Sequence, residues 1–300
     1  MAAENIVMMS ATDTAAAIKA KTFSPLDAVR AYLDRIDRLD SRLSAYITVC
    51  HEEALDAAEQ AKLSLARGDE LGPLFGVPIA IKDQFWTAGI LTTNGSKVYE
   101  DFIPNEDSTV VSRLKQAGGI LLGKLNLSEL AMGGTQNPPW GIPANPWDLE
   151  RTPGESSSGS GVALAAHLCA ASIGEDTGGS GRGPAAYCGV VGLRPTFTRV
   201  SRFGMTPMCW FMDAAAPMTK TVQDCALVLG AIAGFDPKDL YTSHKPVPDY
   251  TESLDRGVQG LRVGLIKELH ESGDMHPEVK QAIERSLRSE EHTSELQSHS

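Results

Sequence analysis

A lysine at the end of an apolar run and two serine-rich segments are the residues of this chain best suited to chemistry. Lys82 follows the apolar run 76–81, which can carry its amino group into a dry environment. Burial disfavours the charged form of a lysine and can lower its pKa by several units, so that the neutral amine acts as a base. Such a base can activate a serine nucleophile. Taken alone, however, a lysine at a strand end is more often an ordinary solvated residue.

The two serine-rich segments are residues 152–161 and 174–185. Neither is a phosphate-binding loop, because Ser160 and Gly161 stand where that motif requires Lys and Ser or Thr. Neither contains the Gly-x-Gly-x-x-Gly fingerprint of dinucleotide-binding proteins. A lone segment of this kind is more often a tight turn. No histidine lies in a motif-like setting, so a Ser-His-Asp triad is not predicted, whereas a Ser-Lys arrangement remains open.

The order and spacing of these segments resemble those of the amidase signature family, which includes the A subunit of glutamyl-tRNA(Gln) amidotransferase. Ser156 lies 74 residues after Lys82, and Ser180 lies 24 residues after Ser156. Three further segments, 123–133, 145–148 and 188–196, support the resemblance, which extends over residues 14–287.

The resemblance implies a Ser–cis-Ser–Lys triad and no metal or other cofactor. Ser180 would be the nucleophile, Ser156 the bridging serine held by a cis peptide bond, and Lys82 the base. The reaction would be hydrolysis of a carboxylic amide, or of an ester, through an acyl-enzyme on Ser180. The oxyanion hole would consist of backbone N–H groups of Thr177, Gly178, Gly179 and Ser180.

Further residues match the family's motifs in supporting positions. Ala131, Met132 and Gly133 match a segment that lines the acyl pocket of relatives. We assign supporting roles in the loops to Ser157, Asp176 and Arg182.

The chain also departs from the family pattern in both loops. Glu155 and Ser158 stand where relatives have glycines, and Gly181 and Gly183 replace larger residues. We expect the carboxylate of Glu155 to raise the pKa of Lys82, which opposes the use of this lysine as a base.

Helices alternate with short apolar strands along the chain, which indicates an α/β layered fold. Pro78 predicts an edge position or a strand start. The resemblance implies a mixed β-sheet between helical layers, truncated at the C-terminus. Helices are expected from Ser24 and Pro277 and over residues 51–67, 108–117, 162–171 and 221–234, strands over 45–50, 75–81, 120–122, 190–193 and 262–266, and a surface loop over 235–250.

Composition limits the class of protein. The 300 residues include 27 basic and 38 acidic side chains, for a net charge of −11, and 42% are hydrophobic, which excludes disorder as the main state. The sequence has no dominant basic patch, so we do not expect binding of nucleic acid through its phosphates.

The five cysteines are odd in number and widely spaced. This pattern argues against a disulfide framework and a zinc ribbon, and it favours the reducing cytoplasm. The most apolar stretch, 161–174, is too short to span a membrane, and residues 1–13 do not form a secretory signal.

The last residues do not continue the pattern. Residues 288–299 resemble the translation of a sequencing-library adapter, so we interpret 288–300 as a non-native tail. Residues 1–287 are then one amidase domain that lacks its C-terminal third.

We expect a stand-alone enzyme that acts on a small-molecule amide. Such an enzyme could be a homodimer. The alternatives are the A subunit of a tRNA-dependent amidotransferase, with partner subunits, or a non-catalytic truncated relative.

Overall fold

In the computed structural model, which describes residues 2–133, 139–258, 260–271, 273 and 275–291, six of the described segments form one mixed β-sheet. The strand order is β1-β3-β2-β4-β6-β5. Strand β2 runs parallel to β3 and β4, whereas the pairs β1–β3, β4–β6 and β5–β6 are antiparallel. The strands are β1 (Tyr46–Val49), β2 (Pro78–Lys82), β3 (Ile120–Leu125), β4 (Ala171–Glu175), β5 (Val191–Gly192) and β6 (Ala215–Thr219).

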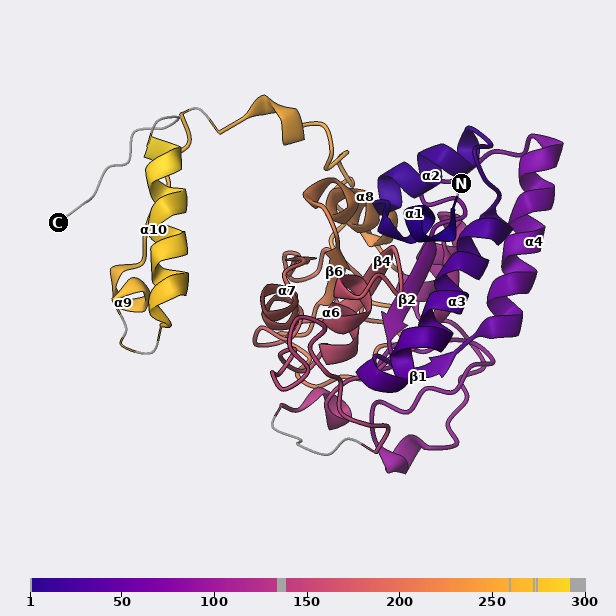
Figure 1. The fold of residues 1–300 in the computed structure, drawn as a ribbon, viewed down its shortest axis with the longest axis horizontal. Coiled ribbons are helices and arrows are strands. Elements are labelled where there is room, and N and C mark those ends of the chain that lie inside the picture. The colour runs from indigo at the N-terminus through magenta and orange to yellow at the C-terminus, as the bar shows by residue number, and fades with distance from the viewer. Residues whose placement is uncertain (1, 134–138, 259, 272, 274, 292–300) are drawn as a thin grey trace. The chain divides into compact units, whose positions relative to one another are not determined.

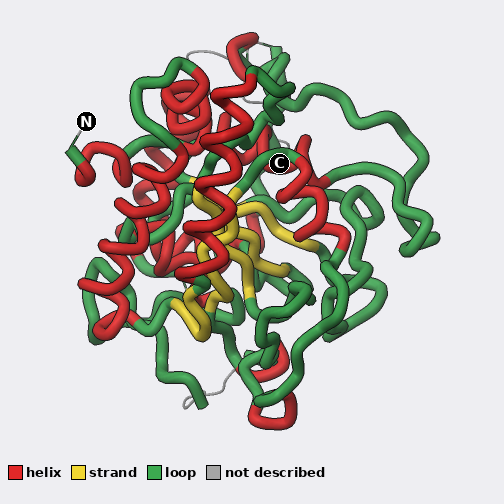
Figure 2. Tube along the Cα trace, turned by 90° about the vertical axis from the view of Figure 1, so that its right-hand side faces the viewer, coloured by secondary structure: helices red, strands yellow, loops and turns green. Residues whose placement is uncertain are grey.

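The chain divides into two compact units, Met1–Thr251 and Glu252–Ser300. In the first unit the strands lie among the helices, as Figures 1 and 2 show, and β2, β4 and β6 are buried along their whole length. The predicted fold class is thereby confirmed. The helices of this unit are α1 (Ala3–Met8), α2 (Ala11–Lys19), α3 (Pro25–Leu43), α4 (His51–Arg67), α5 (Thr109–Gln116), α6 (Ser158–Ala165), α7 (Arg182–Cys188) and α8 (Val222–Ile232). Short 3₁₀ turns are η1 (Lys97–Tyr99) and η2 (Glu129–Ala131).

Local sequence signals explain several of these elements. The capping box of Ser24 and Asp27 begins α3, and Gly68, with a φ of 78°, ends α4. Pro78 is the first residue of β2, as predicted, and β2 is an inner strand between β3 and β4. No helix among the described residues is both long and apolar enough to cross a membrane.

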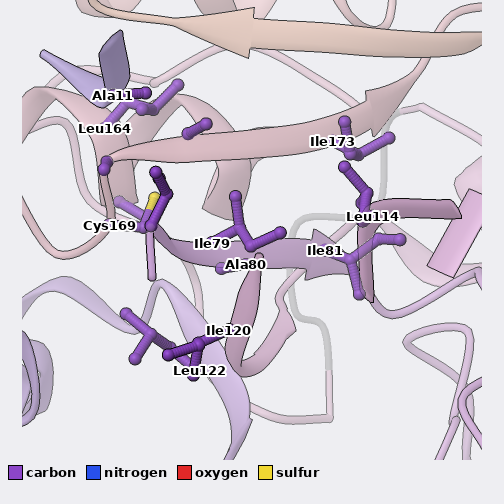
Figure 3. Close-up of a cluster of buried hydrophobic side chains, with 14 of the residues drawn as sticks. Ala11, Ile79, Ala80, Ile81, Leu114, Ile120, Leu122, Leu164, Cys169 and Ile173 are labelled. Atoms are coloured by element: carbon purple, nitrogen blue, oxygen red, sulfur yellow. The ribbon is translucent and has the colours of Figure 1, made fainter. Parts of the chain in front are cut away.

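The core of the first unit forms where the apolar sides of the strands meet the helices. Figure 3 shows Ile79 and Ile81 of β2 and Ile173 of β4 in one cluster with apolar side chains from neighbouring elements. Ile79, Ile81 and Ile173 expose 2% of their surface or less. This packing holds the carboxyl ends of the parallel strands β2 and β4 side by side, which places Lys82 next to Glu175.

The predicted helix 162–171 is only partly correct. Helix α6 begins earlier and ends at Ala165, and Ala171 is the first residue of β4. The chain turns at His167, which has a φ of 56°. Alanine favours helix locally, but Ala171 pairs with Ile79 and Thr219 on the two sides of β4, and sheet pairing overrides that weak preference.

The second unit contains η3 (Leu254–Arg256), α9 (Lys267–His270) and α10 (Pro277–Glu291). The predicted helix from Pro277 is confirmed, and it continues to Glu291, within the segment interpreted as a tail; residues 292–300 lie outside the described residues. The predicted strand 262–266 is wrong, because these residues are irregular. A strand requires a partner, and Leu265 and Ile266 are exposed here.

Candidate active site

Lys82 is the last residue of β2, and its side chain is completely buried. Its Nζ lies 2.8 Å from Ser156 Oγ and 3.2 Å from Glu175 Oε2. Burial lowers the pKa of Lys82 below its usual value, although the neighbouring Glu175 carboxyl acts in the opposite direction. The amine thus lies in the dry environment that the apolar run predicted.

Ser156 lies just before α6, and the Glu155–Ser156 peptide bond is cis. The carbonyl of Ser156 accepts a hydrogen bond from the amide of Ser128 at 3.2 Å. The next residue, Ser157, fastens this loop to the end of β4: its Oγ donates to the carbonyl of Glu175 and accepts from the amide of Glu175, both at 3.1 Å. The loop therefore positions Ser156 and Glu175 together.

Ser180 lies in the loop between β4 and α7, and its carbonyl accepts a hydrogen bond from the amide of Ser157 at 3.3 Å. This contact brings the second serine-rich segment against the first. A Cβ atom on Gly178 or Gly179 would meet nothing within 4 Å, so the space beside these two residues is open. Gly179 has a φ of 132°, which favours glycine.

The four amides assigned to the oxyanion hole differ in their partners. The amide of Gly179 donates to Asp176 Oδ1 at 2.9 Å, so this N–H does not face the open space. Within the described part of the chain, the amides of Thr177, Gly178 and Ser180 make no hydrogen bond. These three are therefore the amides available to an oxyanion.

Asp176 organises the loop that carries Ser180. Its carboxylate accepts hydrogen bonds from the side chain of Arg182 at 2.8 and 3.0 Å and lies 3.4 Å from Arg194 Nε. The amides of Gly181 and Arg182 also donate to it. Burial would raise the pKa of Asp176, but these hydrogen bonds and the Arg182 charge hold it below its usual value. A carboxylate with these donors at the centre of the loop fixes the loop's conformation.

The segment expected to line the acyl pocket lies close to Glu155. Ala131 is buried, Met132 is exposed, and a Cβ atom on Gly133 would stand 3.0 Å from Glu155 Oε2. The carboxyl in contact with Lys82 belongs to Glu175, and the charges that raise the pKa of Lys82 most are those of Glu175, Asp213 and Asp176.

Two carboxyl groups of the site were missed by the sequence analysis. Glu175 is fully buried, and Asp213 lies just before β6. The hydroxyl of Thr177 stands between them, 2.5 Å from Glu175 Oε1 and 2.6 Å from Asp213 Oδ1. The available signal was an acidic residue that ends the apolar run 168–174, but it was hidden by the helix predicted over 162–171.

Comparisons with known proteins identify the family of this chain. The family model described as Amidase matches residues 27–295. The chain is 46% identical over 269 residues to the glutamyl-tRNA(Gln) amidotransferase A subunit from Desulfatibacillum aliphaticivorans, covering 89% of this chain and 55% of that protein. The chain thus spans little more than half the length of such curated relatives.

Solved structures of the same kind superpose closely. The peptide amidase of Stenotrophomonas maltophilia matches 94% of this chain and 60% of its own with a TM-score of 0.87 and 38% identity. A bacterial aryl acylamidase of the amidase signature family matches 96% of this chain and 60% of its own with a TM-score of 0.88 and 28% identity. The family model covers most of the chain and solved structures of the family share its fold, so the chain belongs to the amidase (amidase signature) family.

Proposed function

We propose that this chain carries the catalytic centre of an enzyme that hydrolyses a carboxylic amide of a small molecule through an acyl-enzyme on Ser180. The observation that carries the proposal is the contact between the buried amine of Lys82 and Ser156 Oγ, beside the loop that holds Ser180. A buried amine that is neutral at physiological pH is a competent base, and burial lowers the pKa of Lys82 in that direction.

The first step forms the acyl-enzyme. Ser156 gives its hydroxyl proton to the amine of Lys82 and takes the proton of Ser180, whose oxygen bonds to the substrate carbonyl carbon. The negative charge moves to the carbonyl oxygen, where N–H groups of Thr177, Gly178 and Ser180 stabilise it. The C–N bond then breaks, and Lys82 returns its proton through Ser156 to the leaving nitrogen.

The second step releases the acid. Water gives a proton along the same path to Lys82 while its oxygen attacks the ester carbonyl carbon. The bond to Ser180 breaks, and Ser180 recovers its proton through Ser156. An ester substrate would follow the same path with an alcohol as leaving group. The five free cysteines fit a reducing compartment, and we assign the enzyme to the cytoplasm.

Active-site labelling of the complete protein tests the role of Ser180. A fluorophosphonate probe should label the wild type at Ser180, and Ser180→Ala should lose both the label and the amidase activity. The matched control is Ser112→Ala, a serine on α5 outside both loops, which should keep the label. Unchanged turnover in Ser180→Ala, or labelling at another serine, would refute the assignment.

A second function is favoured by the curated relatives, which include amidotransferase A subunits 46% identical to this chain. In that case the same acyl-enzyme would form from glutamine, and the ammonia released would pass to partner subunits that hold the tRNA. Glutaminase activity that appears only with such partners would favour this function. Hydrolysis of simple amides by the purified protein alone would favour the stand-alone amidase, whereas an absence of both would indicate a non-catalytic relative.

A further inference from the structure

From the hydrogen-bond pattern around Glu175 we infer that this residue is a positioning residue that holds, as a neutral carboxylic acid, the proton that Lys82 would otherwise carry. This inference deepens the proposed function, on which it rests, because it explains how a lysine in contact with a carboxyl group is kept as a free amine. The groups concerned are all buried: Lys82 and Glu175 expose none of their surface, Asp213 exposes 1% and Thr177 exposes 5%.

The argument begins with the single hydrogen of the Thr177 hydroxyl. Thr177 Oγ1 lies 2.5 Å from Glu175 Oε1 and 2.6 Å from Asp213 Oδ1, and both distances are those of O–H···O hydrogen bonds. A hydroxyl has one hydrogen to donate, so it can satisfy only one of the two oxygens. The other contact needs a hydrogen from the carboxyl side, which means that Glu175 or Asp213 is protonated.

Asp213 is the carboxyl that stays ionised. Its oxygens accept hydrogen bonds from the amide of Met208 at 2.9 Å and from the amide of Cys209 at 2.8 and 2.9 Å. Backbone N–H groups that donate to a carboxylate favour its charged form. Glu175 Oε1 has no donor other than Thr177 among the described residues, so the proton belongs on Glu175.

Lys82 fits the same assignment. Its Nζ has two described partners, Ser156 Oγ and Glu175 Oε2. A neutral amine can accept the hydrogen of the Ser156 hydroxyl and donate one of its own hydrogens to Glu175 Oε2, so both contacts form without a charge on Lys82.

With the proton on Glu175, each of these contacts contains one hydrogen. Ser156 donates to the lone pair of Lys82, Lys82 donates to Glu175 Oε2, Glu175 Oε1 donates to Thr177, and Thr177 donates to Asp213 Oδ1. With the proton on Lys82 instead, the oxygens of Glu175 and Asp213 compete for the hydrogen of Thr177. The neutral pair leaves the lone pair of Lys82 directed at Ser156, which is the arrangement that the first catalytic step needs.

Infrared spectroscopy of the full 300-residue chain detects the proton directly. At neutral pH an ordinary carboxyl is ionised, so only a strongly perturbed group shows the C=O stretch of a carboxylic acid. Glu175 is the one buried glutamate among the described residues. We expect such a band at pH 7, shifted by ¹³C-glutamate labelling and absent from Glu175→Gln. The matched control Glu129→Gln, at a partly exposed glutamate on η2, should retain the band.

The isotope labels keep the test decisive even if Glu175→Gln does not fold. Absence of the band from the wild type would overturn the inference, as would a band that shifts with ¹³C-aspartate instead of ¹³C-glutamate. The infrared readout is independent of turnover. If Ser180 proved not to be the nucleophile, the proposed function would be refuted, and the spectrum alone would still decide whether Glu175 carries the proton.

The pH profile of fluorophosphonate labelling provides a second test. The carboxyls that act most strongly on the pKa of Lys82 are Glu175 of β4, Asp213 before β6 and Asp176 in the loop after β4. If Glu175 is already neutral, Glu175→Gln leaves the charge around Lys82 unchanged, and the acidic limb of the profile keeps its midpoint. If Glu175 were an anion that stabilises the ammonium form, its replacement would move the limb to lower pH, which would overturn the inference.

Discussion

At the scale of single residues, the molecule buries two lysines for different purposes. Lys82 and Lys124 each end or nearly end a strand, and each lies against a buried carboxyl group. Asp83, the partner of Lys124, also accepts hydrogen bonds from the amide and hydroxyl of Thr93 at 2.7 and 2.6 Å. Lys124 Nζ lies 3.0 Å from Asp83 Oδ1, so Lys124 and Asp83 form a structural ion pair. Lys82 contacts Ser156 as well as Glu175, and we propose that it transfers protons.

Replacement of Lys82 by methionine should remove the base. We expect Lys82→Met to slow fluorophosphonate labelling of Ser180 by about 10²- to 10⁴-fold, the usual contribution of general acid–base catalysis. The neutral Glu175 left behind retains Thr177 as its hydrogen-bond acceptor, so the variant should fold. Circular dichroism checks the fold, and labelling kinetics check the rate. A Lys82→Met variant with the rate of the wild type would exclude Lys82 as the base.

Replacement of Lys124 by methionine should act on stability. The variant leaves the ionised carboxylate of Asp83 buried without its cation, and loss of one member of a buried ion pair costs about 3–5 kcal/mol. Urea denaturation measures this loss. The double variant Lys124→Met/Asp83→Leu should recover part of it, because it removes the unpaired charge. Equal stability of Lys124→Met and the wild type would contradict the structural role.

At the scale of elements, the first turn of α6 packs closely against the backbone at Ala45 and Asn126. A Cβ atom on Gly159 would lie 2.4 Å from the carbonyl oxygen of Ala45 and 2.6 Å from backbone atoms of Asn126. The amide of Gly159 also donates to the carbonyl of Asn126 at 3.0 Å. Helix α6 can therefore position Ser156 and Ser157 only with glycine at this place.

Replacement of Gly159 by alanine should lower the free energy of unfolding, whereas the same replacement at Gly230 should not. We expect Gly159→Ala to destabilise the protein by about 1–3 kcal/mol or more, because backbone atoms must shift. The control is Gly230→Ala in α8, where a Cβ atom would meet nothing within 4 Å; it should stabilise by about 0.4–1 kcal/mol. Urea denaturation of both variants checks the pair, and an equal effect of the two substitutions would refute the argument.

At the scale of the whole molecule, several aspartates link stability to acidic pH. Hydrogen bonds and neighbouring arginines, acting against burial, hold the pKa values of Asp176 and Asp239 below 3.8, and hydroxyl and amide donors do the same for Asp236. A carboxyl whose pKa is lowered in the folded state stabilises the fold at pH values above its pKa in the unfolded state. This contribution is lost as the pH falls through its pKa in the folded state. Asp40, whose pKa burial raises, acts in the opposite direction.

The free energy of unfolding should therefore fall as the pH drops below 3.8. In Asp176→Asn the charge is absent at every pH, so its unfolding free energy should depend less steeply on pH in this range than that of the wild type. Urea denaturation at a series of pH values measures both slopes. The exposed carboxyl of Glu53 is the matched control site, and Glu53→Gln should keep the slope of the wild type. Identical slopes for wild type and Asp176→Asn would refute the link.

Helices with strong end signals could be predicted from the sequence. The capping box at Ser24 and the glycine after Arg67 are local, and local signals act through neighbours in the chain. The helix predicted over 162–171 was only partly correct, because β4 begins at Ala171, and the strand predicted over 262–266 was wrong. Whether an apolar segment becomes a strand depends on a pairing partner far away in sequence, and the pattern of the segment does not contain this information.

The sequence by itself determined which residue types are available: a lysine after an apolar run, serines 74 and 98 positions later, and glycines around both. Only the tertiary structure decided which carboxyl meets the lysine. Glu155 is adjacent to Ser156 in the chain, yet Glu175, 93 residues from Lys82, makes the contact, because β2 and β4 are parallel neighbours whose carboxyl ends coincide. A pKa depends on burial and on charges within a few ångströms, and those distances exist only after the sheet has formed.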